Sequence, residues 1–261
     1  MSDIFCDIDR QPQGSIYRLT VSRPARLNVL NSAMLQALKR ALVEIARDDD
    51  ARLVILAAAN SKAWIAGADI SEMRHLDKQS AAEFIQRLHG VCNAVRELPV
   101  PVLARISGYC LGAGLELAAS CDLRLASDDS RFGMPEVRVG IPSVIEAALL
   151  PRLIGIGRAC DLVLTGRLVE AQDAYAWGLI EALAPRDALD ALVQDRAHHI
   201  LDAGPRAIRL QKELYRRWQE LPLSAAIEAG VDTFSRAFEG DEPSVYMDRF
   251  LRAHGKDKST D

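Results

Sequence analysis

The sequence lacks the features that mark membrane, secreted and nucleic-acid-binding proteins. Its 261 residues include no apolar run near the roughly 18 that a membrane span needs, so we expect no membrane partner. Residues 1–4 do not form the basic segment that precedes the apolar run of a secretory signal. Lys and Arg total 32 and are dispersed, and the net charge is −4, so we expect no nucleic-acid partner.

Metal and redox motifs are also missing. The five cysteines form no CxxC pair, and an odd count without a secretory signal favours a reducing compartment, so we expect a cytoplasmic protein. The five histidines do not fall at metal-ligand spacing beside cysteines or carboxylates, so no metal site is predicted. There is no GxSxG elbow and no GxxxxGK[ST] loop, and Gly112-Ala113-Gly114 lacks the third glycine of a dinucleotide fingerprint. Nucleotide hydrolysis and hydride transfer are therefore disfavoured.

Apolar periodicity predicts an α/β fold. Hydrophobic residues make up 49% of the chain, enough for one large domain or one domain with an appendage. After a strand at residues 15–21, Asn31-Ser32 is expected to cap a helix. Further strands are predicted at residues 53–56, 102–106 and 123–125, and helices at residues 81–98 and through Glu116. Beyond about residue 143 the pattern is mostly helical, with a short strand at residues 179–183, and Gly204-Pro205 begins a helix-rich tail.

Two glutamates and three glycine-bearing segments suggest a catalytic site. Gly112-Ala113-Gly114-Leu115-Glu116 and Phe132-Gly133-Met134-Pro135-Glu136 each end in a carboxylate, and Ala66-Gly67-Ala68-Asp69 lies upstream. Glycine lets the backbone approach a ligand closely, and loop NH groups can hold an anionic oxygen. Each segment alone is also what an ordinary turn or helix start looks like. Two carboxyls at one site can act as acid and base in adding water to a double bond, and the sequence does not assign the two roles.

Five motifs follow one another along nearly the whole chain. They are Arg23-Pro24-Ala25-Arg26-Leu27-Asn28, Ala66-Gly67-Ala68-Asp69-Ile70, the segment from Gly108 to Leu117, Phe132-Gly133-Met134-Pro135-Glu136 and Leu164-Thr165-Gly166. The set resembles the enoyl-CoA hydratase/isomerase family, the crotonases. The resemblance implies a spiral core of repeated ββα units with the acyl-CoA site over residues 1–200. It also implies a C-terminal helical region, residues 201–261, that assembles a homotrimer or a dimer of trimers.

The same resemblance implies a substrate and a set of site residues. In the family, two backbone NH groups hold the thioester oxygen of an acyl-CoA, and by position these belong to Ala68 and Ala113. The family glutamates that manage water and proton transfer match Glu116 and Glu136. Positions that correspond to the CoA-binding segments are Ala25, Arg26, Leu27, Ala66, Gly67, Asp69, Ile70 and Gly112. We therefore expect hydration of a 2,3-unsaturated acyl-CoA to the 3-hydroxyacyl-CoA, with no cofactor because coenzyme A is part of the substrate.

The segment after Glu136 departs from the family pattern. Hydratases usually carry a glycine-rich stretch there, whereas residues 140–149 are bulkier and slightly longer. Pro142-Ser143 is expected to begin a helix with Glu146 in its first turns, where a carboxylate favours the helix dipole. Otherwise Glu146 is a third acidic group near the acyl chain. Three bulky side chains are expected to shorten or redirect the acyl pocket: Val144, Ile145 and Trp64.

Two other functions stay open. One keeps the oxyanion site and uses Glu136 or Glu146 for isomerisation or thioester hydrolysis. The other is a non-catalytic relative whose trimer is a scaffold for RNA or another protein. The two intact glutamates and the lack of a basic face argue against a scaffold. The sequence gives neither the acyl group nor the choice between trimer and hexamer.

Overall fold

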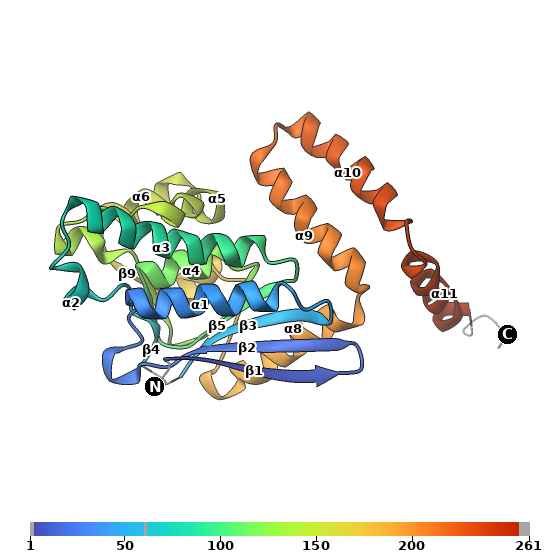
Figure 1. Ribbon diagram of the computed structural model, residues 1–261, viewed down its shortest axis with the longest axis horizontal. Coiled ribbons are helices and arrows are strands. Elements are labelled where there is room, and N and C mark those ends of the chain that lie inside the picture. The colour runs from blue at the N-terminus through green and yellow to red at the C-terminus, as the bar shows by residue number, and fades with distance from the viewer. Residues whose placement is uncertain (1–2, 60–61, 256–261) are drawn as a thin grey trace. The chain divides into compact units, whose positions relative to one another are not determined.

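Two sheets form the centre of the fold. A computed structural model describes residues 3–59 and 62–255 (Figure 1). The larger sheet has the strand order β1-β2-β3-β5-β7-β10, and the smaller has the order β4-β6-β8-β9. The strands of the larger sheet are β1 (Ile4–Gln11), β2 (Gly14–Val21), β3 (Ala51–Ala58), β5 (Val102–Ile106), β7 (Leu123–Ser127) and β10 (Ala182–Ala184). Those of the smaller are β4 (Ala63–Ile65), β6 (Tyr109–Leu111), β8 (Arg131–Gly133) and β9 (Leu168–Glu170).

Consecutive strands alternate between the two sheets. β3, β5 and β7 are parallel neighbours in the larger sheet, and the strand after each of them joins the smaller sheet as β4, β6 or β8, again in parallel. Helices supply the crossovers that parallel neighbours need: α2 (Ile70–Met73) and α3 (Lys78–Glu97) follow β4, and α4 (Ala113–Ser120) follows β6. Each turn of the chain therefore adds one strand to both sheets. The α/β class and the spiral of ββα units expected from the sequence are confirmed.

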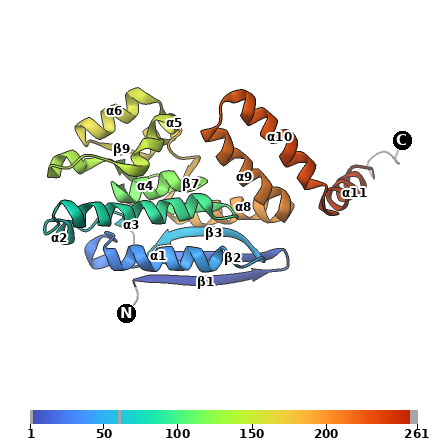
Figure 2. The same cartoon turned by 45° about the horizontal axis from the view of Figure 1, so that its top comes forward.

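Local capping fixes the helices beside the site. The side chain of Asn31 accepts a hydrogen bond from Met34 N at 2.9 Å and begins α1 (Ser32–Ile45), as predicted. Asp77 begins α3 in a capping box with Ser80. The buried side chains of both helices recur at helical spacing, and the two helices pack against one another (Figures 1 and 2).

The region after β8 is mostly helical, as predicted, but it begins differently. Its elements are η2 (Pro135–Val139), η3 (Ile145–Leu149), α5 (Leu150–Ile154), α6 (Ile156–Thr165), α7 (Ala171–Trp177), η4 (Arg186–Ala188) and α8 (Leu189–Asp202). The predicted helix start at Pro142-Ser143 is wrong, because the short 3-10 helix η3 begins at Ile145 after an extended Val144. Glu146 does lie in the first turn of η3, as predicted. Ser143 is occupied elsewhere, since its hydroxyl donates to Glu136.

The chain divides into two compact units within α8, Met1–Ala197 and His198–Asp261. The second contains α9 (Pro205–Glu220), α10 (Leu223–Ala237) and α11 (Glu242–Gly255), so the helical tail beginning at Gly204-Pro205 is confirmed. The carboxylate of Glu242 accepts from the first amides of α9, Arg206 N at 2.9 Å and Ala207 N at 2.8 Å. The assignment of separate roles to residues 1–200 and 201–261 stays a prediction.

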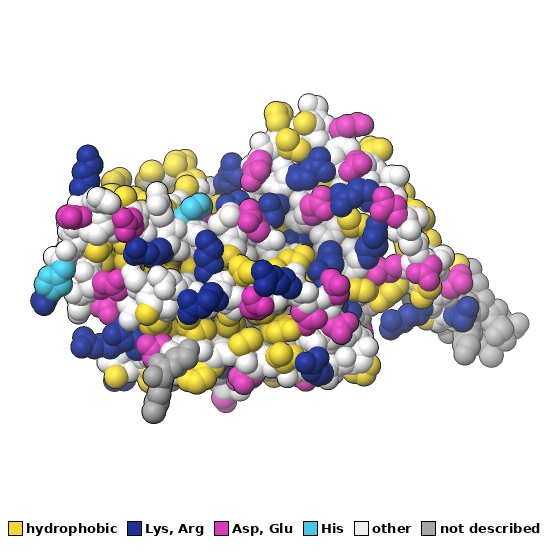
Figure 3. Space-filling model, in the orientation of Figure 1, with side chains coloured by type: hydrophobic (Ala, Val, Ile, Leu, Met, Phe, Trp, Pro, Cys, Tyr) yellow, Lys and Arg dark blue, Asp and Glu magenta, His cyan; other side chains and the backbone are white. Residues whose placement is uncertain are grey.

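On the face shown in Figure 3, Lys and Arg lie among Asp and Glu. Within residues 3–59 and 62–255, no helix combines the length and the apolar composition that crossing a membrane requires.

Candidate active site

A cavity of about 170 Å³ lies where the three glycine-bearing segments meet. The loop before α2 contributes residues 66–68, and the start of α4 contributes Gly112 and Ala113. Glu116 and Glu136 also line it. Most of the remaining wall is apolar, including Phe84, Ile85 and Leu88 of α3. The four residues predicted to be catalytic therefore share one cavity.

Ala68 lines this cavity and forms a parallel bridge with Leu30 that leaves its own amide unused. On one side of the loop, Leu30 N donates to Gly67 O at 2.9 Å and Asp69 N donates to Leu30 O at 2.8 Å. Successive groups along an extended backbone point to opposite sides, so the Ala68 N–H points away from Leu30. In the part of the chain that the structure describes, it donates no hydrogen bond to another protein group. It is available to a ligand oxygen.

The amide of Ala113 is available for a different reason. Ala113 is the first residue of α4, and the first amides of a helix have no acceptor within it. Gly112, at the N-cap, offers no side chain to accept them. Gly114 lets α4 approach β4, because a Cβ on it would lie 2.9 Å from Ile65 Cβ. Since Ala68 and Ala113 line the same cavity, their N–H groups can hold one oxygen together.

Glu116 is the more deeply buried of the two site carboxyls. Only 4% of the residue is exposed, and Oε1 accepts a hydrogen bond from Ala147 N at 3.2 Å. Burial raises the pKa of Glu116 to about 8, and the negative charges of Glu136 and Glu146 add to this effect, while the Ala147 amide opposes it. At neutral pH Glu116 therefore carries a proton.

Glu136 lies in the first turn of η2, half-buried across the cavity wall. Its pKa is also raised by burial, and the Ser143 hydroxyl, which donates to Oε2 at 2.8 Å, opposes the rise. Pro135 at the start of η2 fixes the local backbone, as expected from the sequence. With Glu116 protonated, the two carboxyl groups together hold one proton. One group can then act as an acid while the other acts as a base.

The predicted CoA-binding residues fall into two groups. Ala66, Gly67, Ile70 and Gly112 line the cavity. Asp69 does not, because its carboxylate accepts from Arg23 at 2.7 Å and from Ser71 N at 2.9 Å. Residues 25–27 lie outside the cavity, in an exposed turn around η1 (Pro24–Arg26). A hydrogen bond from Ala66 N to Leu27 O, at 3.2 Å, connects this turn to the loop that lines the cavity.

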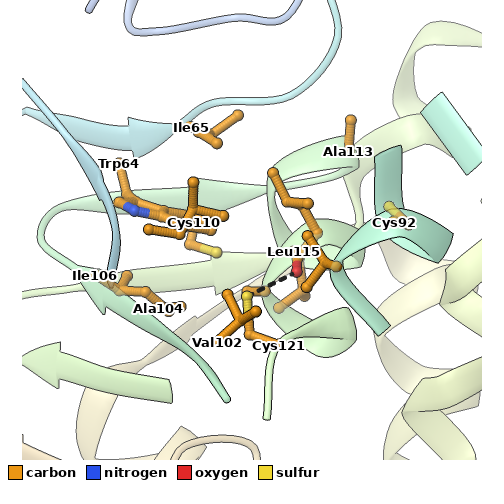
Figure 4. Packing of buried hydrophobic residues seen from close by; sticks show 14 of the residues in the cluster. Trp64, Ile65, Cys92, Val102, Ala104, Ile106, Cys110, Ala113, Leu115 and Cys121 are labelled. Atoms are coloured by element: carbon orange, nitrogen blue, oxygen red, sulfur yellow. Dashed lines mark hydrogen bonds between the residues drawn. The ribbon is translucent and has the colours of Figure 1, made fainter. Parts of the chain in front are cut away.

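Two of the bulky side chains expected at the pocket do not line it. Trp64 is 1% exposed and lies in the core, where Figure 4 shows its ring beside Cys110. Its position on β4 turns it away from the cavity, so the expectation for Trp64 is wrong. Ile145 is also absent from the wall, whereas Val144 is part of it.

Sequence reasoning missed three supporting residues. Ser143 does not begin a helix, and its hydroxyl donates to Glu136. The fully buried Asn28 donates to Ala59 O and Ala63 O at 2.9 Å each, which ties the η1 turn to β4. His89 contacts Glu146 over 57 residues of sequence. Asn28 belongs to the motif of residues 23–28, so the sequence did mark it. Nothing in the local sequence indicates that Ser143 pairs with Glu136 or His89 with Glu146.

Comparison with known proteins gives consistent matches. The sequence model of the enoyl-CoA hydratase/isomerase family matches residues 11–254. A short-chain-enoyl-CoA hydratase of Clostridium acetobutylicum is 32% identical over 242 residues, 92% of this chain and 93% of that protein. A crotonyl-CoA hydratase of Syntrophomonas wolfei is 32% identical, over 89% of this chain and 90% of that one. The crystal structure of an enoyl-CoA hydratase from Bacillus anthracis superposes with a TM-score of 0.91 at 30% identity, covering 96% of each chain.

Proposed function

The chain belongs to the enoyl-CoA hydratase/isomerase family, and from this premise we propose that it adds water to a 2,3-unsaturated acyl-CoA to give the 3-hydroxyacyl-CoA. One observation carries the proposal: two available amides and two carboxyls with raised pKa values line the same cavity. Relatives named for hydration of short enoyl-CoA thioesters support it.

In the proposed reaction, the thioester oxygen accepts hydrogen bonds from the N–H groups of Ala68 and Ala113. As the hydroxyl oxygen of water bonds to C3, electrons move from the C2–C3 double bond onto the thioester oxygen, which becomes enolate-like. Each preorganised donor contributes about 3 kcal/mol to such a transition state. Glu116 and Glu136 take a proton from water and deliver one to C2, and the pair ends the cycle with the proton count it began with.

The CoA part of the substrate is assigned to the segments that lead to the cavity. Ala66, Gly67, Ile70 and Gly112 line the wall. Exposure of the turn at residues 25–27 supports contact with the CoA arm there, and Arg26 can meet a phosphate. The reaction as written needs no cofactor beyond CoA itself. A cytoplasmic location stays a prediction.

Assembly with further copies is also proposed. Along α10 and its C-cap, five apolar side chains at helical spacing are exposed, by 53–78%: Leu223, Ile227, Val231, Phe234 and Phe238. An exposed apolar stripe of this kind is typical of a protein interface. Together with the family resemblance it supports a homotrimer or a dimer of trimers. Light scattering should give the mass of a multimer, and Phe234→Asp should reduce it; a wild-type monomer contradicts the proposal.

The test of the reaction uses purified protein with crotonyl-CoA and a longer 2-enoyl-CoA. Hydration removes the conjugated thioester absorbance. Wild-type protein should consume at least one substrate rapidly, and Glu116→Gln and Glu136→Gln should each lower the rate by about a hundredfold or more. Glu83→Gln, at an exposed position of α3, is the matched control and should react as wild type does. No reaction despite measurable binding of the CoA ester would exclude hydration and favour isomerisation or thioester hydrolysis.

A further inference from the structure

Glu146 is a buried carboxylate that lies behind the cavity wall. It is the second residue of η3, it is 4% exposed, and it does not line the cavity. The preceding Ile145 has a φ of 39°, a left-handed conformation that a β-branched residue rarely adopts. The backbone is therefore strained at Ile145, which lies between Val144 on the cavity wall and the buried Glu146.

His89 connects Glu146 to the surface. Its Nδ1 lies 2.8 Å from Glu146 Oε1, and its side chain is 51% exposed. A carboxylate only accepts hydrogen bonds, so Nδ1 carries the proton in this pair. On α3, His89 directly follows Leu88, which lines the cavity. The pair thus links the cavity wall of α3 to η3.

Glu146 influences Glu116 in two ways, through the backbone next to it and through its charge. The next residue, Ala147, donates its amide to Glu116 Oε1 at 3.2 Å, so the turn that holds Glu146 also holds Glu116. The negative charge of Glu146 in addition favours the protonated form of Glu116. The titratable groups placed against Glu146 are His89 and Cys92 from α3 and Glu116 from α4.

A purely structural role does not account for this carboxylate. Among the described residues, Glu146 Oε2 is buried and has no hydrogen-bond partner. A buried unpaired carboxylate oxygen is costly, and an amide or an apolar side chain at this position would avoid placing a charge there. The charge itself is therefore the feature that needs a function.

We propose that Glu146, anchored from the surface by His89, is a positioning residue for the proton-holding Glu116, an inference that rests on the hydratase function proposed above. It acts through the η3 turn and through its charge, and it does not touch the substrate. The segment of residues 140–149 differs from the glycine-rich stretch expected after Glu136 in supplying a third carboxylate, Glu146, next to the Ala147 amide that binds Glu116.

The test compares Glu146→Gln with wild type by two measurements. Infrared absorption of protonated carboxyl groups is followed against pH, and the band absent from Glu116→Gln is assigned to Glu116. The pH dependence of kcat/KM for hydration is measured in parallel. Glutamine keeps the size of the side chain and an oxygen that accepts from His89, but it removes the charge. The midpoint of the Glu116 band and the alkaline limb of kcat/KM should both move down by about one pH unit.

Further variants separate the charge from folding. His89→Ala removes the donor that stabilises the Glu146 carboxylate, and it should move both midpoints in the same direction by a smaller amount. His89→Gln keeps a donor and should bring both midpoints part of the way back to the wild-type values. Glu83→Gln, on the same helix, should move neither. Circular dichroism and the melting temperature report whether each variant is folded.

The outcomes distinguish this inference from the proposed function. An unchanged Glu116 midpoint in folded Glu146→Gln overturns the positioning role, whether or not the wild type hydrates enoyl-CoA. If the wild type is inactive but the midpoint still shifts, hydration is wrong and Glu146 positions Glu116 for another reaction. Equal shifts in Glu146→Gln and Glu83→Gln also overturn the inference, because they would reflect net charge alone.

Discussion

The carboxylate of Glu136 lies against the Cα of Gly112, in the space that a Cβ at position 112 would need. Gly112 itself has φ 50° and ψ −122°, which L residues rarely adopt. The same residue is the N-cap of α4 and directly precedes Ala113, which lines the cavity and whose amide has no acceptor within the helix. One glycine therefore permits both the close approach of the Glu136 carboxylate and the exposure of the Ala113 amide, which we propose as an oxyanion donor.

Replacing Gly112 by alanine should displace the Glu136 carboxylate. A displacement of about 1 Å at reacting groups lowers rates by about a hundredfold, and we expect that loss in kcat/KM for Gly112→Ala. Gly155→Ala is the control: Gly155 has a φ of 80°, but nothing lies within 4 Å of the added Cβ. It should lower the melting temperature without lowering kcat/KM. Equal activity losses in the two variants would show that backbone strain, not the carboxylate, is responsible.

Hydration should lose activity on the alkaline side with a midpoint near pH 8. Burial and the neighbouring carboxylates raise the pKa of Glu116 to about 8, so above that pH the pair loses the proton that it shares. The pH dependence of kcat/KM reports the free enzyme and is the quantity to measure. The residual activity of Glu116→Gln should lack this limb. A wild-type profile that stays flat to pH 9.5, about 1.5 units above this midpoint, would contradict the assignment.

Glu116→Gln should stabilise the fold as pH rises. The pKa of Glu116 rises from an ordinary 4.5 to about 8 on folding, so stability from this group is fully present below pH 4.5 and is lost as pH climbs to 8. Glutamine cannot ionise and avoids the loss. Relative to its value at pH 4, the difference in unfolding free energy between variant and wild type should grow by about 3 kcal/mol at pH 7. Urea unfolding at several pH values measures it, and a pH-independent difference would refute it.

The family resemblance indicated the candidate site residues, and short-range features of the chain explain why they share one cavity. Ala68 lies in the loop after β4, and Ala113 begins α4 just after β6. Because β4 and β6 are parallel neighbours, the spiral brings these two segments together at one end of a sheet. Glycines at positions 67 and 112 mark the positive φ angles there. Glu116 follows one loop by a single helical turn. These relationships depend on residues close in sequence or on a regular repeat, which is why the sequence indicates them.

Contacts between distant segments could not be predicted in this way. His89 and Glu146 meet because α3 packs against η3, and nothing near either residue signals the pairing. Trp64 does not shorten the pocket as expected, because strand alternation turns its bulky side chain into the core. Strand β1 was not predicted, since nearly all its residues are exposed and it pairs only with β2 at the sheet edge.

Removing the Ser143 hydroxyl should raise the pKa of Glu136. Ser143 donates to Oε2 at 2.8 Å and stabilises the ionised form, opposing the effect of burial. In Ser143→Ala the acid limb of kcat/KM should therefore move to higher pH by about half a unit to one unit, with activity recovering above it. Ser143→Thr keeps the hydroxyl and should resemble wild type. A uniform loss at all pH values would instead indicate that Ser143 positions Glu136 without changing its ionisation.

Shortening Val144 should extend the acyl pocket. Val144 lines the cavity, and it stands in the bulky segment where relatives are expected to carry glycine. A pocket that gains the space of one or two methyl groups should favour a longer acyl chain by about tenfold, the usual effect of a methylene in an apolar site. We expect Val144→Ala to raise the ratio of kcat/KM for a longer 2-enoyl-CoA to that for crotonyl-CoA by this amount. Val43→Ala, on α1 at the same 38% exposure but away from the cavity, should leave the ratio unchanged. If Val144→Ala alters both substrates equally, the acyl chain ends elsewhere along the cavity wall.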